Sequence, residues 1–419
     1  GNGSEDPRDW RVYFVMTDRF VDGYSGNNNI YGDEYRAPNN DSEEALRYYN
    51  GGDFKGLIDN LDYIKSMGFN AIWITPVVKQ PEGRYVNSKQ SYDAAGYHGY
   101  WGYDFDSIDP HLESPGATFQ DLINIAHSKG IRVILDIVVN HGHGGDAHPS
   151  VRWYNDRLKI KLDGQWWTYD QTTDPYYNNT NGVSDIWENS PGFFNYRGDY
   201  KLLDLLDFNE CDPRTRQHLI NVYKKFIDMG VDGFRIDTVA YMRKQWWGIF
   251  ADAIWEYAAS KGKPWFWQVG EAWVATRSEA LSYTTYSNHK ALSVLDLHGS
   301  CMDFPGQAKG IFAGNTGFEQ MANIMSSDYS GGIDPTFLGT FVDNHDKPRF
   351  PGGWVNSNEM VRIWKNALNW YFLARGIPIV YYGTEFEGTS DSINDYYGAG
   401  GPAGEPKNRK YVGQDRINR

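Results

Sequence analysis

Residues 132–141, Arg132-Val-Ile-Leu-Asp-Ile-Val-Val-Asn-His141, begin as an apolar run and end in polar side chains. Similar segments recur at Gly233-Phe-Arg-Ile-Asp237, Gly270-Glu-Ala-Trp273 and Phe341-Val-Asp-Asn-His-Asp346. Each reads as the end of a buried β-strand that is followed by carboxylate, amide or imidazole groups. The four segments therefore predict one site that is built from several strand ends.

Short apolar runs alternate with amphipathic stretches along the chain, which is the pattern of a parallel α/β sheet with helical crossovers. We predict strands at Val12–Met16, Ala71–Thr75, Arg132–Val138, Gly233–Ile236, Trp265–Val269, Ser293–Asp296, Leu338–Val342 and Ile377–Tyr381. We predict helices near Phe54–Met67, Thr118–Lys129, Pro213–Met229, Lys244–Ser260, Phe318–Met325 and Glu359–Arg375. Eight strands of this kind indicate a (β/α)8 TIM barrel, whose functional groups lie at the C-terminal ends of the strands.

An unusually long stretch separates the third predicted strand from the third predicted helix and is rich in Trp, Asn, Asp and Gly. Such a loop without structure of its own would be improbable in a compact domain. Within it, residues 158–168 alternate around Asp163-Gly164, which is typical of a β-hairpin. We therefore predict an irregular β-rich domain inserted at 142–203, and a barrel domain formed by 1–141 and 204–419.

Composition excludes several classes of protein. The formal net charge of −14 argues against a nucleic-acid partner, although plain solubility also explains the acidity. No apolar run is long enough to predict a membrane span, and Gly1–Pro7 lacks the apolar core of a signal peptide. Two cysteines, Cys211 and Cys301, are too few for a disulfide scaffold, and a single bridge between them stays open.

The four segments, together with Gly96-Tyr-His-Gly-Tyr-Trp101, stand in an order and spacing that resembles the α-amylase superfamily of retaining α-glucoside hydrolases and transglycosylases. The resemblance runs from about Arg11 to about Glu385 and is greatest to extracellular α-amylases and cyclodextrin glucanotransferases. It implies the same barrel, the same inserted domain and a secreted or periplasmic location. After Glu385 neither an eighth barrel helix nor the C-terminal β-sandwich common in the family is evident, and we interpret the chain as trimmed rather than as an unusual barrel.

Cleavage of a glycosidic bond with retention requires a carboxylate nucleophile and a carboxylic acid about 5–5.5 Å apart. By resemblance, Asp237 is the nucleophile, Glu271 is the general acid and base, and Asp346 is a third carboxylate that orients sugar hydroxyls. Arg235 lies on the same strand face as Asp237 and is expected to keep it ionised. Taken singly, each of these groups could instead form a salt bridge or a cap at the barrel end.

The resemblance also implies two kinds of sugar contact. Histidines are expected to bind hydroxyls of the reacting sugar, and the ring of Tyr100 is expected to stack under it. Beyond the cleaved bond, Tyr241 or Trp273 is expected to stack a sugar. The full set of expected substrate contacts is His98, Tyr100, His141, Arg235, Tyr241, Trp273 and His345.

Two groups of oxygen donors resemble calcium sites of the family, and hard donors of this kind suit Ca²⁺. The first group is Asn140, Asp207 and the carbonyl of Tyr241, which would join the inserted domain to the barrel. The second resembles the N-terminal calcium loop of the cyclodextrin glucanotransferases, although Tyr24 stands where an Asn ligand is expected. Its residues are Asp22, Asn27, Asn28, Gly51 and Asp53. A capped turn, or a turn rich in Asn and Gly, would look similar without metal.

Together these features predict a calcium-dependent, endo-acting hydrolase of α-1,4-glucosidic bonds in starch, glycogen and maltooligosaccharides. The 16 Trp, 30 Tyr and 21 Phe suit such a partner, although core packing also uses them. A cyclodextrin glucanotransferase or another transglycosylase would carry the same catalytic residues. Cyclising members place Phe or Tyr in the middle of the cleft, where this chain has Leu203. A non-catalytic glycan-binding protein is the remaining alternative, although such proteins usually lose an acid that this chain keeps.

Overall fold

A closed parallel barrel forms the centre of the molecule. The computed structural model describes residues 5–179, 185–288, 291–295, 310–328, 334–347, 349–350, 358–386 and 408–419. Eight parallel strands follow the order β14-β13-β12-β7-β2-β1-β16-β15, and an isolated bridge between Leu295 and Gly339 joins the two edges. The strands are β1 (Val12–Val15), β2 (Ala71–Ile74), β7 (Arg132–Ile137), β12 (Gly233–Ile236), β13 (Trp267–Gly270), β14 (Leu292–Val294), β15 (Gly339–Thr340) and β16 (Ile377–Tyr381). The predicted (β/α)8 barrel is confirmed.

Burial explains why these runs become strands. All residues of β7 after Arg132 are buried, as expected for a parallel strand that is covered on both faces. β7 pairs with β2 on one side and with β12 on the other, with Ile236 opposite Ile137. The residues that follow β7 and β12 therefore emerge at the same end of the barrel.

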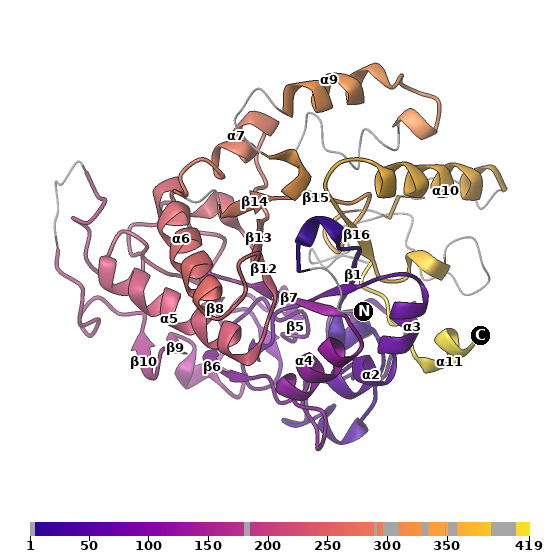
Figure 1. Cartoon of the computed structure of the whole chain (residues 1–419). Coiled ribbons are helices and arrows are strands. Elements are labelled where there is room, and N and C mark those ends of the chain that lie inside the picture. Colours follow the sequence, from indigo (N-terminus) through magenta and orange to yellow (C-terminus); the bar gives the residue numbers. More distant parts are fainter. Residues whose placement is uncertain are drawn as a thin grey trace.

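Helices cover the outside of the barrel, as Figure 1 shows for α4, α5, α6 and α10. Their bounds are α1 (Glu43–Leu46), α2 (Phe54–Asp59), α3 (Leu61–Ser66), α4 (Phe119–Ser128), α5 (Pro213–Met229), α6 (Lys244–Ser260), α7 (Arg277–Ser282), α9 (Glu319–Asp328), α10 (Asn358–Leu373) and α11 (Gln414–Asn418). α5 has clear end signals: Asp212 accepts a hydrogen bond from the backbone of Arg214, Pro213 is the first helical residue, and Gly230 ends the helix at φ 107°.

The helix predicted over residues 54–67 is interrupted at Asn60. The side-chain nitrogen of Asn60 donates to the Gly56 carbonyl at 2.8 Å, and the amides of Asn60 and Gln414 exchange hydrogen bonds at 2.8 and 3.1 Å. A side-chain amide that bonds to backbone groups competes with the regular helix pattern. The break between α2 and α3 is thus where the C-terminal helix α11 contacts the barrel.

A second, mostly antiparallel sheet lies beside the barrel in the order β10-β9-β6-β3. β9 (Lys159–Leu162) and β10 (Gln165–Thr168) form the hairpin predicted around Asp163-Gly164. The other two strands are β6 (Asp104–Ile108) and β3 (Val78–Lys79), which lie in the connection between β2 and β7. Their pairing with the hairpin was not predicted from the sequence. The shorter pairs are β8 (His141–Gly144) with β11 (Leu205–Asp207), and β4 (Tyr85–Val86) with β5 (Asp93–Ala94). The exact boundaries of an inserted domain stay a prediction.

Two further expectations concern membrane and disulfide chemistry. Within the described ranges, no helix has the length and apolar character needed to cross a bilayer. Cys211 is buried with a free thiol, while Cys301 lies outside the described residues.

Candidate active site

The three predicted catalytic carboxylates lie at the C-terminal ends of barrel strands. Asp237 directly follows β12, Glu271 directly follows β13, and Asp346 lies in the loop after β15. The backbone N–H of Asp237 donates to the carbonyl of Ile137 at 2.9 Å, and that of Glu271 donates to the carbonyl of Ile236 at 2.8 Å. Each of these two carboxylates is therefore fixed by a backbone that still belongs to the strand ladder.

One guanidinium group connects the carboxylates. Arg235 is fully buried, and its Nη1 donates to Oδ1 of Asp237 and to Oδ1 of Asp136, both at 2.9 Å. Its Nη2 donates to Oε2 of Glu271 at 2.9 Å. Because the two nitrogens of a single side chain reach Asp237 and Glu271, these two carboxyl groups face a common space. The arrangement is compatible with the separation of about 5–5.5 Å used by retaining glycosidases.

Glu271 is in a position that favours its protonated form. Burial raises the pKa of Glu271 well above its ordinary value, and the negative charges of Asp237 and Asp346 act in the same direction, although Arg235 opposes them. A side-chain hydrogen bond to Asp237 also raises this pKa. Oε2 of Glu271 already accepts from Arg235 and, at 3.3 Å, from the backbone N–H of Thr238. Glu271 is thus suited to deliver a proton.

Asp346 is in the opposite electrostatic situation. Burial alone would raise the pKa of Asp346, but the neighbouring His345 ring and the charges of Arg409 and Arg235 outweigh burial and lower it. Nη2 of Arg409 lies 2.9 Å from Oδ1 of Asp346, and Nε2 of His345 lies 3.2 Å from Oδ2. The structure therefore keeps Asp346 ionised beside a carboxyl group that is neutral.

Arg409 was not predicted, because it lies 63 residues after Asp346 in sequence and beyond a long Gly-rich stretch. Its Nη1 also donates to the hydroxyl of Tyr97 at 3.3 Å. The preceding residue, Asn408, donates to the carbonyl oxygens of Asn344 and Lys347, so the segment is bonded directly to the loop that carries Asp346. The only signal in the sequence is an Asn-Arg pair in otherwise irregular sequence.

Asp136 is buried and contacts both Arg235 and Tyr100, a role that was not predicted from its sequence motif. Burial raises the pKa of Asp136 to about 7, with Arg235 acting against this shift. Its Oδ2 accepts from the hydroxyl of Tyr100 at 2.7 Å and from Nε1 of Trp73 at 3.0 Å. The same hydroxyl lies 2.8 Å from Nε2 of His345. Asp136 thereby fixes the ring that is predicted to lie under the reacting sugar.

The three predicted histidines are buried and neutral. Burial lowers the pKa of His141 to about 4, that of His345 to about 3, and that of His98 well below its ordinary value. A neutral imidazole offers one donor and one acceptor to sugar hydroxyls. Gly99 lets the segment that carries His98 and Tyr100 pack against Pro76. It has φ +86°, and a Cβ there would lie 2.2 Å from the carbonyl oxygen of Pro76.

Tyr241 and Trp273 lie in the loops that carry Asp237 and Glu271, and Leu203 lies in the turn before β11. Tyr241 ends the 3₁₀ helix η5 (Val239–Tyr241), which begins two residues after Asp237. Trp273 follows Glu271 by two residues, and its side chain is 43% exposed. Leu203 is 80% exposed and has φ +51°, which is uncommon for a residue with a branched side chain. Strained, exposed residues of this kind suit a functional surface.

The first predicted calcium ligands converge in the structure. The side-chain amide of Asn140 lies between the carbonyl oxygen of Tyr241, at 2.9 Å, and Oδ1 of Asp207, at 3.2 Å. In one orientation the amide nitrogen donates to both oxygens, and in the other the amide oxygen joins them as a third cation ligand. Burial raises the pKa of Asp207 well above its ordinary value, so this carboxylate gains from a nearby cation. The oxygens fit Ca²⁺, which takes about six to eight such ligands.

The second set of predicted calcium ligands also lies together. Asp53 caps α2 and accepts from the backbone N–H groups of Gly23, Tyr24 and Gly56. The side-chain oxygens of Asn27 and Asn28 are buried and accept no hydrogen bond within the described part of the chain. A buried oxygen without a donor is costly unless a cation binds it. Gly51 is adjacent, because a Cβ on it would lie 2.8 Å from Oδ2 of Asp22 and from Nδ2 of Asn28.

Both sets combine one or two carboxylates with amide or carbonyl oxygens. This agrees with the finding that the described residues contain no group of three or more His, Cys, Asp or Glu side chains placed to hold a metal ion. The residues present therefore fit calcium, and they do not fit a histidine- or thiolate-bound transition metal.

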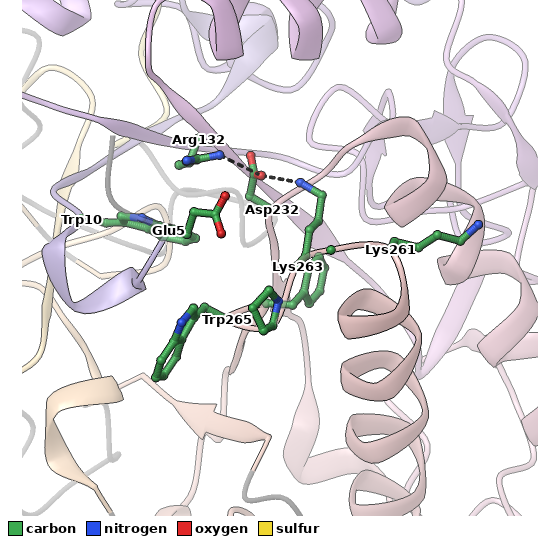
Figure 2. Close-up of a pocket in the computed structure, with 10 residues that line it drawn as sticks. Glu5, Trp10, Arg132, Asp232, Lys261, Lys263 and Trp265 are labelled. Carbon is green, nitrogen blue, oxygen red and sulfur yellow. Dashed lines mark hydrogen bonds and ion pairs between the residues drawn. The ribbon is translucent and has the colours of Figure 1, made fainter. Parts of the chain in front are cut away.

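A separate pocket lies at the other end of the barrel, where β7, β12 and β13 begin (Figure 2). Its central carboxylate, Asp232, accepts from Nζ of Lys263 at 2.7 Å and from the backbone N–H of Val133 at 2.8 Å. Nε2 of His127 lies 2.6 Å from the same carboxylate. Groups at this face of a barrel normally contribute to stability. We assign the pocket a structural role, because its central carboxylate is already paired within the protein.

Comparison with known proteins gives consistent matches. Residues 14–415 match the family described as alpha amylase, catalytic domain. The chain is 33% identical over 400 residues to the cyclomaltodextrin glucanotransferase of Thermoanaerobacterium thermosulfurigenes, covering 91% of this chain and 50% of that protein. It is 35% identical over 405 residues to the beta/alpha-amylase of Paenibacillus polymyxa, covering 92% and 29%. The crystal structure of gamma-CGTase from alkalophilic Bacillus clarkii superimposes with a TM-score of 0.73 at 25% identity, covering 97% and 54%. The chain thus spans about half, or less, of the length of these relatives.

Proposed function

Since the chain belongs to the α-amylase family, we propose that it hydrolyses internal α-1,4-glucosidic bonds of starch, glycogen and maltooligosaccharides with retention of configuration. The observation that carries this proposal is the bridge that Arg235 makes between Asp237 and Glu271, at 2.9 Å to each. One carboxylate fixed by a buried cation, next to a carboxyl group with a raised pKa, is the pair that double displacement requires.

In the first step, Asp237 attacks the anomeric carbon while Glu271 protonates the leaving glycosidic oxygen. The bond to the leaving sugar breaks and an ester bond to Asp237 forms. In the second step, Glu271, now ionised, takes a proton from water as the water oxygen attacks the same carbon, and the ester bond breaks. Arg235 keeps Asp237 aimed in both steps.

Several neighbours would act on the sugar that reacts. Ionised Asp346 and the neutral imidazoles of His141 and His345 supply acceptors and donors for its hydroxyls. Tyr100 would support the sugar ring from below, because Asp136 fixes the tyrosine hydroxyl. Contacts that strengthen as the ring flattens lower the barrier more than contacts that only bind the substrate.

Calcium would have a structural role. Asn140 follows β7, Asp207 ends β11 in the long connection before α5, and Tyr241 ends η5 after β12. An ion bound to these three residues would connect the three segments. When bound, the ion would supply positive charge to the buried carboxylate of Asp207. We also propose, from the resemblance alone, that the protein acts outside the cytoplasm.

The test is a reducing-sugar assay on soluble starch, combined with NMR of the first anomer released. We expect shorter α-configured products and loss of nearly all turnover in Glu271→Gln, with starch binding retained. Glu279→Gln, an exposed carboxylate in α7, is the matched control and is expected to stay active. An active Glu271→Gln enzyme, or native protein that binds starch without cleaving it, would contradict the proposal.

A cyclising transferase is the second candidate, and the identity to cyclomaltodextrin glucanotransferases favours it. Leu203 disfavours it, because this exposed position lacks the aromatic ring around which a glucan chain would curl. Chromatography of the products from soluble starch separates the two candidates. Cyclic dextrins as the main product would replace hydrolysis by cyclisation as the function.

A further inference from the structure

Lys347 and Trp273, each close in sequence to a catalytic carboxylate, contact each other. Nζ of Lys347 lies 4.6 Å from the centroid of the Trp273 indole, in cation–π geometry. Lys347 is the residue after Asp346, and Trp273 is two residues after Glu271. The contact therefore connects the loop after β13 with the loop after β15, close to two carboxylates of the site.

The backbone of Lys347 is held firmly in place. Oδ1 of Asn344 accepts from the backbone N–H groups of both Asp346 and Lys347, each at 2.9 Å. The carbonyl of Lys347 accepts from the side chain of Asn408. The lysine side chain thus extends from a fixed turn toward the indole, unlike a lysine on a free surface.

The position of Trp273 indicates which part of the substrate would meet it. The groups that would bind the reacting sugar are Tyr100, His141 and His345, which lie in loops other than the one that carries Trp273. Glu271 would protonate the oxygen of the leaving sugar, so the leaving side lies next to Glu271 and the residues that follow it. An indole that is 43% exposed there can stack the apolar face of a sugar.

We propose that Lys347 is a specificity-determining residue: it occupies the face of Trp273 that an incoming acceptor sugar would use, and so favours water over sugar as the acceptor. The inference rests on the proposed function and extends it to the fate of the intermediate. In the second step, the ester bond between Asp237 and the anomeric carbon breaks. The new bond comes from the oxygen of water or of a sugar hydroxyl, and the proton of that oxygen goes to Glu271.

The size of the effect follows from the contact. A cation–π contact at a partly exposed site changes an equilibrium by a factor of about two to five. An acceptor sugar must first displace the ammonium group from the ring, whereas water need not. Removal of the ammonium group is therefore expected to raise the ratio of transfer to hydrolysis by about that factor.

The experiment measures this ratio with a maltooligosaccharide donor and increasing concentrations of maltose as acceptor. Lys347→Met is expected to raise the ratio of transfer to hydrolysis about two- to fivefold. Lys347→Arg, which retains a cation, is expected to keep the native ratio. Lys224→Met is the matched control, because its Nζ lies 4.9 Å from the ring of Tyr257 on the outer helices, and its ratio should equal the native one. In a Trp273→Ala background, Lys347→Met should have no further effect.

A ratio that stays the same or falls in Lys347→Met would overturn the inference, and a fall would show that Lys347 binds the acceptor. Such a result leaves the proposed function intact, since hydrolysis by the native protein is scored separately in the same reactions. Absence of both transfer and hydrolysis in the native protein would instead contradict the proposed function.

Discussion

Replacement of Arg235 by Lys tests whether a bridging guanidinium organises the site. Lysine retains the positive charge, but its ammonium group is a compact donor that does not reproduce the planar fork of arginine. The native side chain makes three hydrogen bonds of 2.9 Å to Asp136, Asp237 and Glu271. Loss of fixed donors of this kind at a reacting centre typically costs about 2.7–4 kcal/mol, so we expect kcat/KM to fall about 10²- to 10³-fold.

The pH dependence separates orientation from charge in this variant. Arg235 lowers the pKa of Glu271, while burial raises it, and lysine leaves the positive charge in place. The alkaline limb of the kcat/KM profile, which reports the pKa of the acid, should therefore stay where it is in the native enzyme. Arg132→Lys, at the opposite end of the barrel, is the control, because its Nη1 is paired with Asp232 at 3.8 Å. A kcat/KM of Arg235→Lys within about threefold of the native value would refute the reasoning.

Three further outcomes are expected. Chelation of calcium should lower the melting temperature and the activity together, because a metal that binds only the folded protein adds to its stability, and Asp207→Asn should weaken this response. If a chelator changes neither quantity, the assignment of Asp207 is wrong. His111 is buried between Asp109 and Glu34. Burial opposes its charge, but these carboxylates raise the pKa of His111 to about 9. The contribution of protonated His111 to stability is therefore full below its ordinary pKa of 6.5 and is lost as the pH rises through 9. The pKa of Glu34 is about 2, since hydrogen bonds outweigh burial, and its contribution is full above 4.5 and lost as the pH falls toward 2. Urea unfolding of native protein and His111→Gln should diverge most between pH 4.5 and 6.5, and parallel curves from pH 5 to 9 would exclude the network. Leu203→Tyr should increase cyclic products on chromatography, and an unchanged profile would show that this exposed position does not contact the glucan.

The barrel could be predicted because its strands are short buried apolar runs that end in recognisable polar segments. β12 (Gly233–Ile236) and β16 (Ile377–Tyr381) have the predicted bounds, since the local sequence alone defines them. β15 contains only Gly339–Thr340, although a strand was predicted over Leu338–Val342, because the pairing ends before the loop of Asp346. The strand β3 has two residues, too few for any periodic signal.

Site residues were predicted where a catalytic side chain directly follows a strand. They were missed where only tertiary contacts bring a residue into the site. Asp237 and Glu271 come directly after strands, so their meeting follows from the barrel itself. Asp136 lies within the segment of residues 132–141. Only the fold shows that its two carboxylate oxygens accept hydrogen bonds from Arg235, Trp73 and Tyr100. The role of Arg409 was hidden for a similar reason, because the chain returns to Asp346 after a long separation in sequence.

The central claim is that Asp237 forms the covalent intermediate while Glu271 supplies the proton. The most direct measurement uses Glu271→Gln incubated with an activated 5-fluoro-α-glucosyl fluoride, followed by peptide mass spectrometry. The fluoride leaves without help from an acid, so the first step proceeds. The second step is slow, because the variant lacks the carboxylate that takes the proton from water. We predict one 5-fluoroglucosyl unit on the peptide that contains Asp237. No adduct, or an adduct on Asp136 or Asp346 instead, would contradict the account.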